Sequence, residues 1–307
     1  MNFKKPKFWD LKKPNFLSYI LLPFTIFIKI NNFFLNCFPA SKIKKIKTIC
    51  IGNIYIGGTG KTPTTIKLYN IFRNLNYKVV SGKKYYKSQI DEQIILDKKT
   101  KLITAKTRKE IIKKAIDLNY ELIVFDDGLQ DKNVNYDLKI VCFDTKSWIG
   151  NGQLLPAGPL RENLHSLKKY DAIFLKNNND FDKIKKILIN FNPAIKVFTF
   201  DYVITNLNKF NLSDNFISFC GLGNPENFKK ILHNQNFSIV DELIFSDHHN
   251  YKETEINNIL KKAKKLNAKI ITTEKDYVKI PKKFKNDINY LDINFRIKDE
   301  ERLINFL

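Results

Sequence analysis

The chain has 307 residues, of which 43% are hydrophobic and 13% aromatic, enough apolar surface for one large or two modest folded domains. This composition excludes wholesale disorder and the collagen-like and mucin-like classes. The formal net charge of +22 arises from 53 basic and 31 acidic residues, yet only five of the basic residues are Arg. Because the excess is mostly Lys and no nucleic-acid-binding motif accompanies it, we expect no nucleic acid partner, whereas an anionic membrane surface stays open as a partner.

The N-terminal forty residues combine basic, aromatic and apolar side chains. A Lys-rich start over 4–13 precedes an apolar stretch over 16–28 that is too short to span a bilayer. On a helix, the polar residues of this region fall mostly on one stripe, formed by Ser18, Thr25, Lys29, Asn32 and Asn36. We therefore predict that 1–40 forms an amphipathic helix, kinked at Pro23, that lies on a membrane surface. A helix packed on the protein's own core is the alternative. A signal peptide ending near residues 39–41 is disfavoured, because a nucleotide-binding pattern follows at once.

A glycine-rich segment follows a short apolar run over 47–51, which indicates a buried strand. The segment reads Gly57, Gly58, Thr59, Gly60, Lys61 and Thr62, and a helical pattern begins at Pro63. Strand, loop and helix in this order are typical of a phosphate-binding loop, in which backbone N–H groups and the helix N-terminus face phosphate oxygens. We expect Lys61 to reach the β- and γ-phosphates of ATP and Thr62 to hold Mg²⁺. The motif is a variant, because Tyr55 stands where the standard pattern has Gly.

A second apolar run over 122–125 ends in Asp126 and Asp127. An apolar strand that ends in Asp is the usual partner of a phosphate-binding loop, and its carboxylate holds Mg²⁺ directly or through water. We predict that Asp126 and Asp127 are metal ligands. The residues alone do not decide which of the two contacts the ion.

Strand and helix patterns alternate along the chain, which predicts an α/β fold of the P-loop NTPase type: a mostly parallel sheet with helices on both faces. The predicted strands lie at 47–51, 78–81, 121–126, 138–143, 171–175, 196–200, 216–220, 238–244 and 269–273. The predicted helices lie at 63–75, 107–118, 181–190, 225–235 and 253–266. A polar, Asn-rich stretch near 204 interrupts the pattern. We therefore predict a core over 41–203 and a smaller C-terminal α/β lobe over 204–307, in addition to the N-terminal segment over 1–40.

Several further segments are unusual for folding elements. They read, in chain order, GGTGKTP at 57–63, DDGLQ at 126–130, GNGQLLPAGPLRE at 150–162, GLGNPENF at 221–228, DHH at 247–249 and TTEKD at 272–276. Together they resemble the tetraacyldisaccharide 4'-kinase family, the lipid A 4'-kinases of Gram-negative bacteria, over roughly residues 15–280. The resemblance implies transfer of the γ-phosphate of ATP, with Mg²⁺, to the 4'-hydroxyl of a lipid-linked disaccharide 1-phosphate. It also implies work at the cytoplasmic leaflet of the inner membrane. It places Gln130 near the nucleotide, and Arg161 and Glu162 near the nucleotide or the acceptor phosphate.

The resemblance also suggests the base. The family's base is an Asp in a GDEP segment, assisted by the first His of a DHH-type motif. The matching stretch here, 90–93, keeps only its Asp-Glu centre, so the role passes to Asp91, with His248 as its partner. Asp247 could orient the imidazole. A carboxylate supported by an imidazole can remove the proton of a sugar hydroxyl, a poor nucleophile by itself.

The sequence departs from the family over 79–93, where the loop is shorter and the Arg of an S-R-G-Y segment is absent. Lys83, Lys84 or Lys87 could supply the missing cation, although Lys is not a fork-shaped phosphate clamp. Two alternatives stay open: another membrane-associated P-loop NTPase, and a decayed homologue that only binds nucleotide. The departure favours the second of these.

Overall fold

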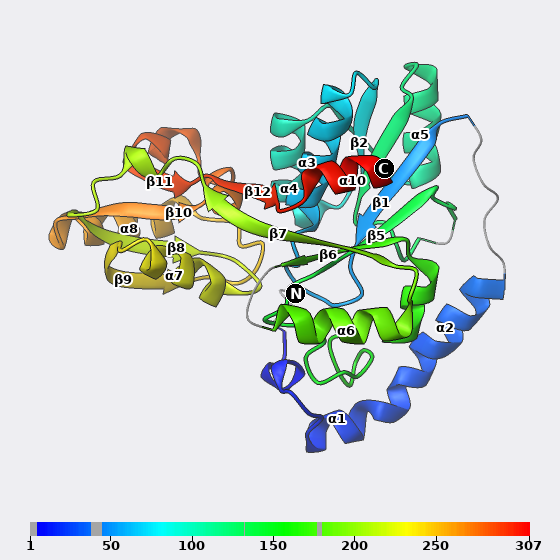
Figure 1. The fold of residues 1–307 in the computed structure, drawn as a ribbon. Helices are drawn as coiled ribbons and strands as arrows, with labels where there is room; N and C mark the ends of the chain where they lie inside the picture. The colour runs from blue at the N-terminus through cyan, green and yellow to red at the C-terminus, as the bar shows by residue number, and fades with distance from the viewer. Residues whose placement is uncertain (1–4, 38–44, 132, 177–179) are drawn as a thin grey trace. The chain divides into compact units, whose positions relative to one another are not determined.

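The structure, a computed structural model, describes residues 5–37, 45–131, 133–176 and 180–307 (Figure 1). By their contacts the residues form two compact units. The larger unit comprises Lys5–Tyr85, Leu96–Asp201 and Phe295–Leu307, and the smaller unit comprises Tyr86–Ile95 and Tyr202–Asn294. The predicted domain boundaries at 40 and 203 stay predictions. The structure adds that the short segment carrying Asp91 belongs to the same unit as the segment carrying His248.

The larger unit is built on an eight-stranded sheet with the order β12-β7-β6-β5-β1-β4-β2-β3. Its strands are β1 (Lys47–Gly52), β2 (Val79–Lys84), β3 (Leu102–Ala105), β4 (Leu122–Asp126), β5 (Leu138–Phe143), β6 (Ala172–Lys176), β7 (Lys196–Ile204) and β12 (Ile293–Ile297). Strands β1 to β7 pair in parallel with their neighbours. The predicted mostly parallel α/β sheet is therefore confirmed.

The central strands are buried on both faces. All five residues of β4 and the last five of β1 are buried, and successive strand residues point to opposite faces of a sheet. This explains why these strands are continuous apolar runs and do not alternate with polar residues. The helices of this unit are α3 (Lys61–Asn74), α5 (Arg108–Asp117), α6 (Phe181–Phe191) and α10 (Glu300–Phe306). Helix α3 packs on β1, β2 and β4, and α5 packs on β2 and β3.

The N-terminal segment of the larger unit is helical but broken. A 3₁₀ turn over Lys7–Asp10 precedes α1 (Phe16–Leu21), and a second 3₁₀ turn over Leu22–Phe24 separates α1 from α2 (Thr25–Cys37). Pro23 lies in that second turn, where we predicted a kink. In the described part of the chain no helix combines the length and apolarity needed to cross a membrane. The side chain of Asn36 and residues 38–41 lie outside the described residues.

The smaller unit has its own four-stranded parallel sheet, with the order β11-β10-β8-β9. Its strands are β8 (Asn215–Cys220), β9 (Ser238–Ile244), β10 (Ala268–Thr273) and β11 (Ile288–Leu291). Its helices are α7 (Pro225–Asn234), α8 (Glu253–Lys265) and α9 (Glu274–Tyr277), together with the first part of α4 (Ile90–Lys99). Buried apolar residues from α8 and α7 form two core clusters with this sheet.

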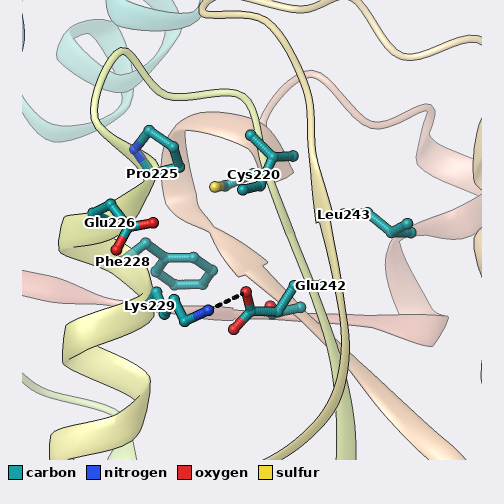
Figure 2. A pocket seen from close by; sticks show the side chains of 9 residues that line it. Cys220, Pro225, Glu226, Phe228, Lys229, Glu242 and Leu243 are labelled. Atoms are coloured by element: carbon teal, nitrogen blue, oxygen red, sulfur yellow. Dashed lines mark hydrogen bonds and ion pairs between the residues drawn. The ribbon is translucent and has the colours of Figure 1, made fainter. Parts of the chain in front are cut away.

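A small pocket lies between α7 and β9 of this unit (Figure 2). Cys220, Pro225 and Phe228 line it, and the ion pair between Lys229 Nζ and Glu242 Oε2, at 2.8 Å, crosses it. Its volume of ≈ 10 Å³ admits about one water molecule. A substrate does not fit there, so the functional groups must be sought elsewhere.

Candidate functional site

The glycine-rich loop joins β1 to α3, as the sequence predicts, and α3 begins at Lys61. Gly60 has φ +88° at the start of this helix, a left-handed conformation that residues with a Cβ rarely adopt. Gly57 has φ +146°. A Cβ placed on Gly58 would meet no atom within 4 Å, so this side of the loop borders open space. A helix start beside open space is the arrangement that accepts phosphate oxygens.

Asn53, a fully buried residue that the sequence analysis did not single out, holds the loop in shape. Its Nδ2 donates to the carbonyl oxygen of Gly57 and to Thr59 Oγ1, both at 3.1 Å. Tyr55 is buried in a cluster with Leu154 and Leu160, and its hydroxyl donates to Asp10 Oδ1 at 2.8 Å. The residue that departs from the standard loop pattern is thus used to pack the loop against the N-terminal segment.

Asp126 ends β4 and is fully buried. Its Oδ2 accepts from Thr62 Oγ1 at 3.2 Å and lies 2.6 Å from Lys83 Nζ, and its Oδ1 accepts from Thr65 Oγ1 at 3.4 Å. Thr62 and Asp126, predicted separately from two motifs, therefore meet. A hydroxyl beside a carboxylate offers the oxygen ligands that Mg²⁺ prefers, so this donor set fits the ion.

Asp127 lies between two cations of the larger unit. Its φ of +54° is uncommon for a residue with a side chain. The carboxylate lies 3.1 Å from Arg161 Nη1 and 3.8 Å from Lys61 Nζ. Burial alone would raise the pKa of this carboxyl, but Lys61, Arg161 and Lys83 outweigh burial and lower the pKa to about 2. Asp127 is therefore ionised at neutral pH and keeps Lys61 and Arg161 close to the phosphate loop.

The remaining predicted nucleotide residues form a hydrogen-bonded chain. Arg161 Nη1 donates to Gln130 Oε1 at 3.2 Å, and Gln130 Nε2 donates to Glu162 Oε1 at 3.0 Å. Gln130 Nε2 also donates to the carbonyl of Asn53 at 3.0 Å, and Tyr170 donates its hydroxyl to Glu162 Oε1 at 2.8 Å. The structure thus brings Gln130, Arg161 and Glu162 together beside the loop, and adds Asn53 and Tyr170. No sequence motif marks Tyr170.

The segment in which the sequence departs from the family supplies one buried cation. Of the three lysines considered there, Lys83 is 1% exposed and paired with Asp126, Lys84 is partly buried, and Lys87 is exposed. A further buried cation, Arg108, donates to Asp131 Oδ2 at 2.8 Å and to the carbonyl of Asp127. The sequence analysis placed Arg108 only inside a predicted helix, so its contribution to the Asp126–Asp127 turn was not predicted.

The second group of polar residues belongs to the smaller unit. Asp91, at the start of α4, is 1% exposed. His248 lies in the loop after β9 with φ +56°, and its Nδ1 is 2.9 Å from Asp91 Oδ1 and 3.0 Å from Asp91 Oδ2. The pair proposed from two distant motifs therefore forms. The φ of His248 lies in the left-handed region, which His adopts more often than most residues with a side chain.

Two lysines that follow β10 surround this pair. Lys275 Nζ lies 3.3 Å from His248 Nε2 and 3.1 Å from Asp247 Oδ1, and Lys279 Nζ lies 3.7 Å from Asp91 Oδ2. Because an ammonium group only donates, Nε2 accepts, and the imidazole proton resides on Nδ1, facing Asp91. Burial would raise the pKa of the Asp91 carboxyl, but the hydrogen bond from His248 and the charges of Lys275 and Lys279 lower it below its usual value. Asp247 was expected to orient the imidazole. Its carboxylate accepts from the His248 backbone N–H at 3.0 Å, and it pairs with Lys275.

The N-terminal helices of the larger unit present an apolar face to solvent. Ser18 and Thr25, from the predicted polar stripe, are buried, and Asn151 Nδ2 donates to Ser18 Oγ at 2.9 Å. The exposed large apolar residues of this face are Phe16, Leu17, Tyr19, Ile20, Phe24, Ile26, Phe27, Ile30 and Phe33. Two residues of the predicted polar stripe, Ser18 and Thr25, thus face the protein, whereas a third, Lys29, is exposed. Phe16 is 77% exposed and Phe27 is 68% exposed.

Comparison with known proteins gives a consistent result. A model of the tetraacyldisaccharide-1-P 4'-kinase family matches residues 16–90 and 80–307. The tetraacyldisaccharide 4'-kinase of Pelagibacter ubique is 44% identical over the whole of this chain and 98% of its own length, and that of Rickettsia akari is 34% identical over 97% and 94%. The crystal structure of LpxK from Aquifex aeolicus in complex with ATP superposes with a TM-score of 0.71. It covers 94% of this chain and 98% of that chain at 21% identity, and so supports the fold.

Proposed function

Because this chain belongs to the tetraacyldisaccharide 4'-kinase family, we propose that the two groups of polar residues described above serve one phosphoryl transfer. The chain is a kinase of lipid A biosynthesis that uses ATP and Mg²⁺ to phosphorylate the 4'-hydroxyl of a tetraacyl disaccharide 1-phosphate. In this proposal the larger unit holds the nucleotide and the smaller unit activates the acceptor.

The larger unit holds the phosphates by charge. The loop of Gly57, Gly58, Thr59 and Gly60 leads into the start of α3 and borders open space at Gly58, and Lys61 and Arg161 supply two cations. Thr62 and Asp126 would hold Mg²⁺, which neutralises charge on the phosphates when bound. Gln130 and Glu162 keep the Arg161 guanidinium in position. Fixed cations of this kind stabilise the charge that spreads over the transferred phosphoryl group.

Asp91 is the proposed base, and the observation that carries this role is its contact with His248 at 2.9 Å. The carboxylate is ionised at neutral pH, because its partners lower its pKa. It can accept the proton of the acceptor hydroxyl as the oxygen attacks, while the Nδ1–H of His248 keeps the carboxylate oriented. Catalysis of this type contributes a factor of about 10²–10⁴.

The fate of the γ-phosphate tests this proposal. Purified protein is incubated with [γ-³²P]ATP, Mg²⁺ and detergent-dispersed disaccharide 1-phosphate, and the lipid and aqueous phases are counted. We expect label in the lipid with wild type and very little with Asp91→Asn, while both proteins bind ATP equally. Label that appears only as free phosphate would favour an NTPase of other function, and no ATP binding would favour a decayed homologue. Equal transfer by Asp91→Asn would assign the base elsewhere.

We also propose that the apolar face of α1 and α2 lies in the cytoplasmic leaflet of the inner membrane. Eight large apolar side chains are exposed on these two helices, and Phe24 is exposed in the turn between them, which is unusual for a surface that meets only water. Lys7, Lys12, Lys13 and Lys29 are exposed on the same segment and can pair with anionic headgroups. A surface that lies on the membrane would bring the protein to the bilayer that contains a lipid-linked acceptor.

Vesicle flotation tests this surface without removing any part of the fold. The triple variant Phe16→Ser, Phe27→Ser, Phe33→Ser should reduce binding to anionic phospholipid vesicles at least about tenfold, because each ring loses favourable burial. A matched control changes the exposed Val240 and Ile244 of the smaller unit to Ser. Equal flotation of the triple variant and wild type would refute the membrane role of this face.

A further inference from the structure

Lys83 has an unusual position for a lysine. It is the next-to-last residue of β2, beside β4 and in register with Asp126, so the two side chains project on the same face of the sheet. The side chain is 1% exposed and its Nζ lies 2.6 Å from Asp126 Oδ2. Burying an ammonium group costs free energy, which a charged partner compensates only in part. The presence of the buried Lys83–Asp126 pair therefore calls for a physical explanation.

The carboxylate oxygen that Lys83 contacts is the one that Thr62 also contacts. Thr62 Oγ1 donates to the same Asp126 Oδ2, at 3.2 Å. Thr62 and Asp126 are the residues that would hold Mg²⁺. A divalent ion on these two groups would therefore have the Lys83 ammonium as a close neighbour, and both cations would share one carboxylate.

The local charge balance makes this sharing depend on the nucleotide. Lys61, Lys83 and Arg161 carry three positive charges around the two negative charges of Asp126 and Asp127. Mg²⁺ alone would add two positive charges to a cluster that already has one in excess. The phosphates of ATP bring enough negative charge to reverse that excess, so the ion and the nucleotide favour each other's entry.

We propose that Lys83 is a positioning residue that holds the Asp126 carboxylate toward Thr62 and makes Mg²⁺ binding depend on the phosphates of the nucleotide. In the nucleotide-free protein the ammonium takes the place of the metal as the counter-ion of Asp126. The Lys83–Asp126 pair keeps the Asp126 carboxylate in the orientation needed for metal binding. It also disfavours binding of Mg²⁺ in the absence of nucleotide. This inference rests on the proposed assignment of Asp126 as a metal ligand, and goes beyond it by assigning a role to a cation that no motif marks.

Metal binding to nucleotide-free protein tests the proposal, because it needs no catalysis. Mn²⁺ binding is measured by electron paramagnetic resonance at pH 8, with and without a non-hydrolysable ATP analogue, for wild type, Lys83→Met and Lys83→Gln. Gln retains a donor toward Asp126 but carries no charge. Wild type should bind Mn²⁺ weakly alone and much more tightly with the analogue. Both variants should bind Mn²⁺ at least about tenfold more tightly than wild type in the absence of nucleotide, since one repelling charge is removed.

The controls separate this role from simple packing. Lys84→Met removes a lysine from the same strand and should leave metal affinity within about twofold of wild type. Adding Asp126→Asn to Lys83→Met should abolish the gain. The proposal is overturned if the Lys83 variants bind nucleotide-free Mn²⁺ no better than wild type. It is also overturned if wild type binds Mn²⁺ equally well with and without nucleotide, an outcome that needs no variant to fold. Failure of the analogue to bind at all would instead count against the proposed nucleotide site.

Discussion

Asp126 and Asp127 of the larger unit and Asp91 of the smaller unit each lie close to cationic side chains. The two groups differ in the kind of side chain that contacts the carboxylate. Asp126 and Asp127 pair with the side chains of Lys61, Lys83 and Arg161, which only donate hydrogen bonds. Asp91 has two lysines nearby, yet its hydrogen-bond partner is the imidazole of His248, whose ring nitrogens can both donate and accept. The first cluster can hold charge, and the second can also move a proton. Changes in the two clusters should therefore produce different defects.

The largest effect is expected for Asp91→Asn, which keeps the shape of the side chain and removes the proton acceptor. Turnover should fall by about 10²–10⁴ with the affinity for ATP unchanged. Single-turnover phosphorylation and equilibrium nucleotide binding measure the two quantities. Asp97→Asn, an exposed position on the same helix, is the matched control. Loss of ATP affinity in Asp91→Asn would contradict the division of roles.

A somewhat smaller effect, about 10²–10³ in turnover, is expected for Lys61→Met, because one preorganised cation is lost from the phosphate cluster. In contrast to Asp91→Asn, this variant should also bind ATP more weakly, as measured by calorimetry. Lys67→Met removes a lysine of the same helix that pairs with Glu300, and should retain activity. If Lys61→Met bound ATP as tightly as wild type, Lys61 would not contact the phosphates.

Lys275→Met should shift the pH profile more than it changes the maximal rate. Lys275 is one of the groups that lower the pKa of Asp91, together with His248 and Lys279, so its removal raises that pKa. The base must be ionised to act. The acid limb of kcat/KM should therefore move to higher pH, while Asp247 and Glu92, which also face Lys275, lose a cation. An unchanged acid limb, with wild-type stability, would mean that Asp91 is not the titrating group.

The smallest expected effect concerns acid stability. The pKa of Asp127 is about 2 in the folded protein and near 3.9 in an unfolded chain, so its ion pairs stabilise the fold above the unfolded value. That contribution, about 1–3 kcal/mol, should be lost as the pH falls toward 2. Urea unfolding of wild type and Asp127→Asn should show a stability difference at pH 6 that narrows with acidification. A difference independent of pH would assign the loss to packing.

Most strands of the eight-stranded sheet could be predicted from the sequence. Its central strands are buried on both faces, and their sequences are therefore continuous apolar runs. The elements that were not predicted are short or contain mixed residues. They are α4, β3, α9, β11, β12 and α10. Strand β3 has four residues and follows Lys101 directly, so neither its length nor its pattern exceeds that of a loop. Helix α4 carries Asp91, but its sequence alternates charged and apolar residues without a clear apolar stripe.

At the site, the residues that belong to sequence motifs could be predicted. The residues that reach the site only through the tertiary structure could not. Thr62 and Asp126 were each found from a local pattern, and a parallel sheet brings the ends of their strands together. Asn53 and Tyr170 support this site through bonds to the glycine-rich loop and to Glu162, and nothing nearby in sequence reveals those partners. Lys83 was one of three equivalent lysines until the register of β2 with β4 placed it opposite Asp126.

The loop that ends in Arg161 is fastened to the start of the chain. Trp9 is 2% exposed, its Nε1 donates to the carbonyl of Pro156 at 3.0 Å, and its own carbonyl accepts from the backbone N–H of Asn151 at 3.0 Å. A truncated protein that begins after α2, designed to avoid the use of detergent, would lose these contacts of Trp9. We expect such a protein to have a lower affinity for ATP, and this change would not arise from the loss of lipid binding. Point substitutions of the exposed Phe residues of α1 and α2 would leave the contacts of Trp9 in place. Such substitutions are therefore preferable to truncation for obtaining the enzyme without detergent.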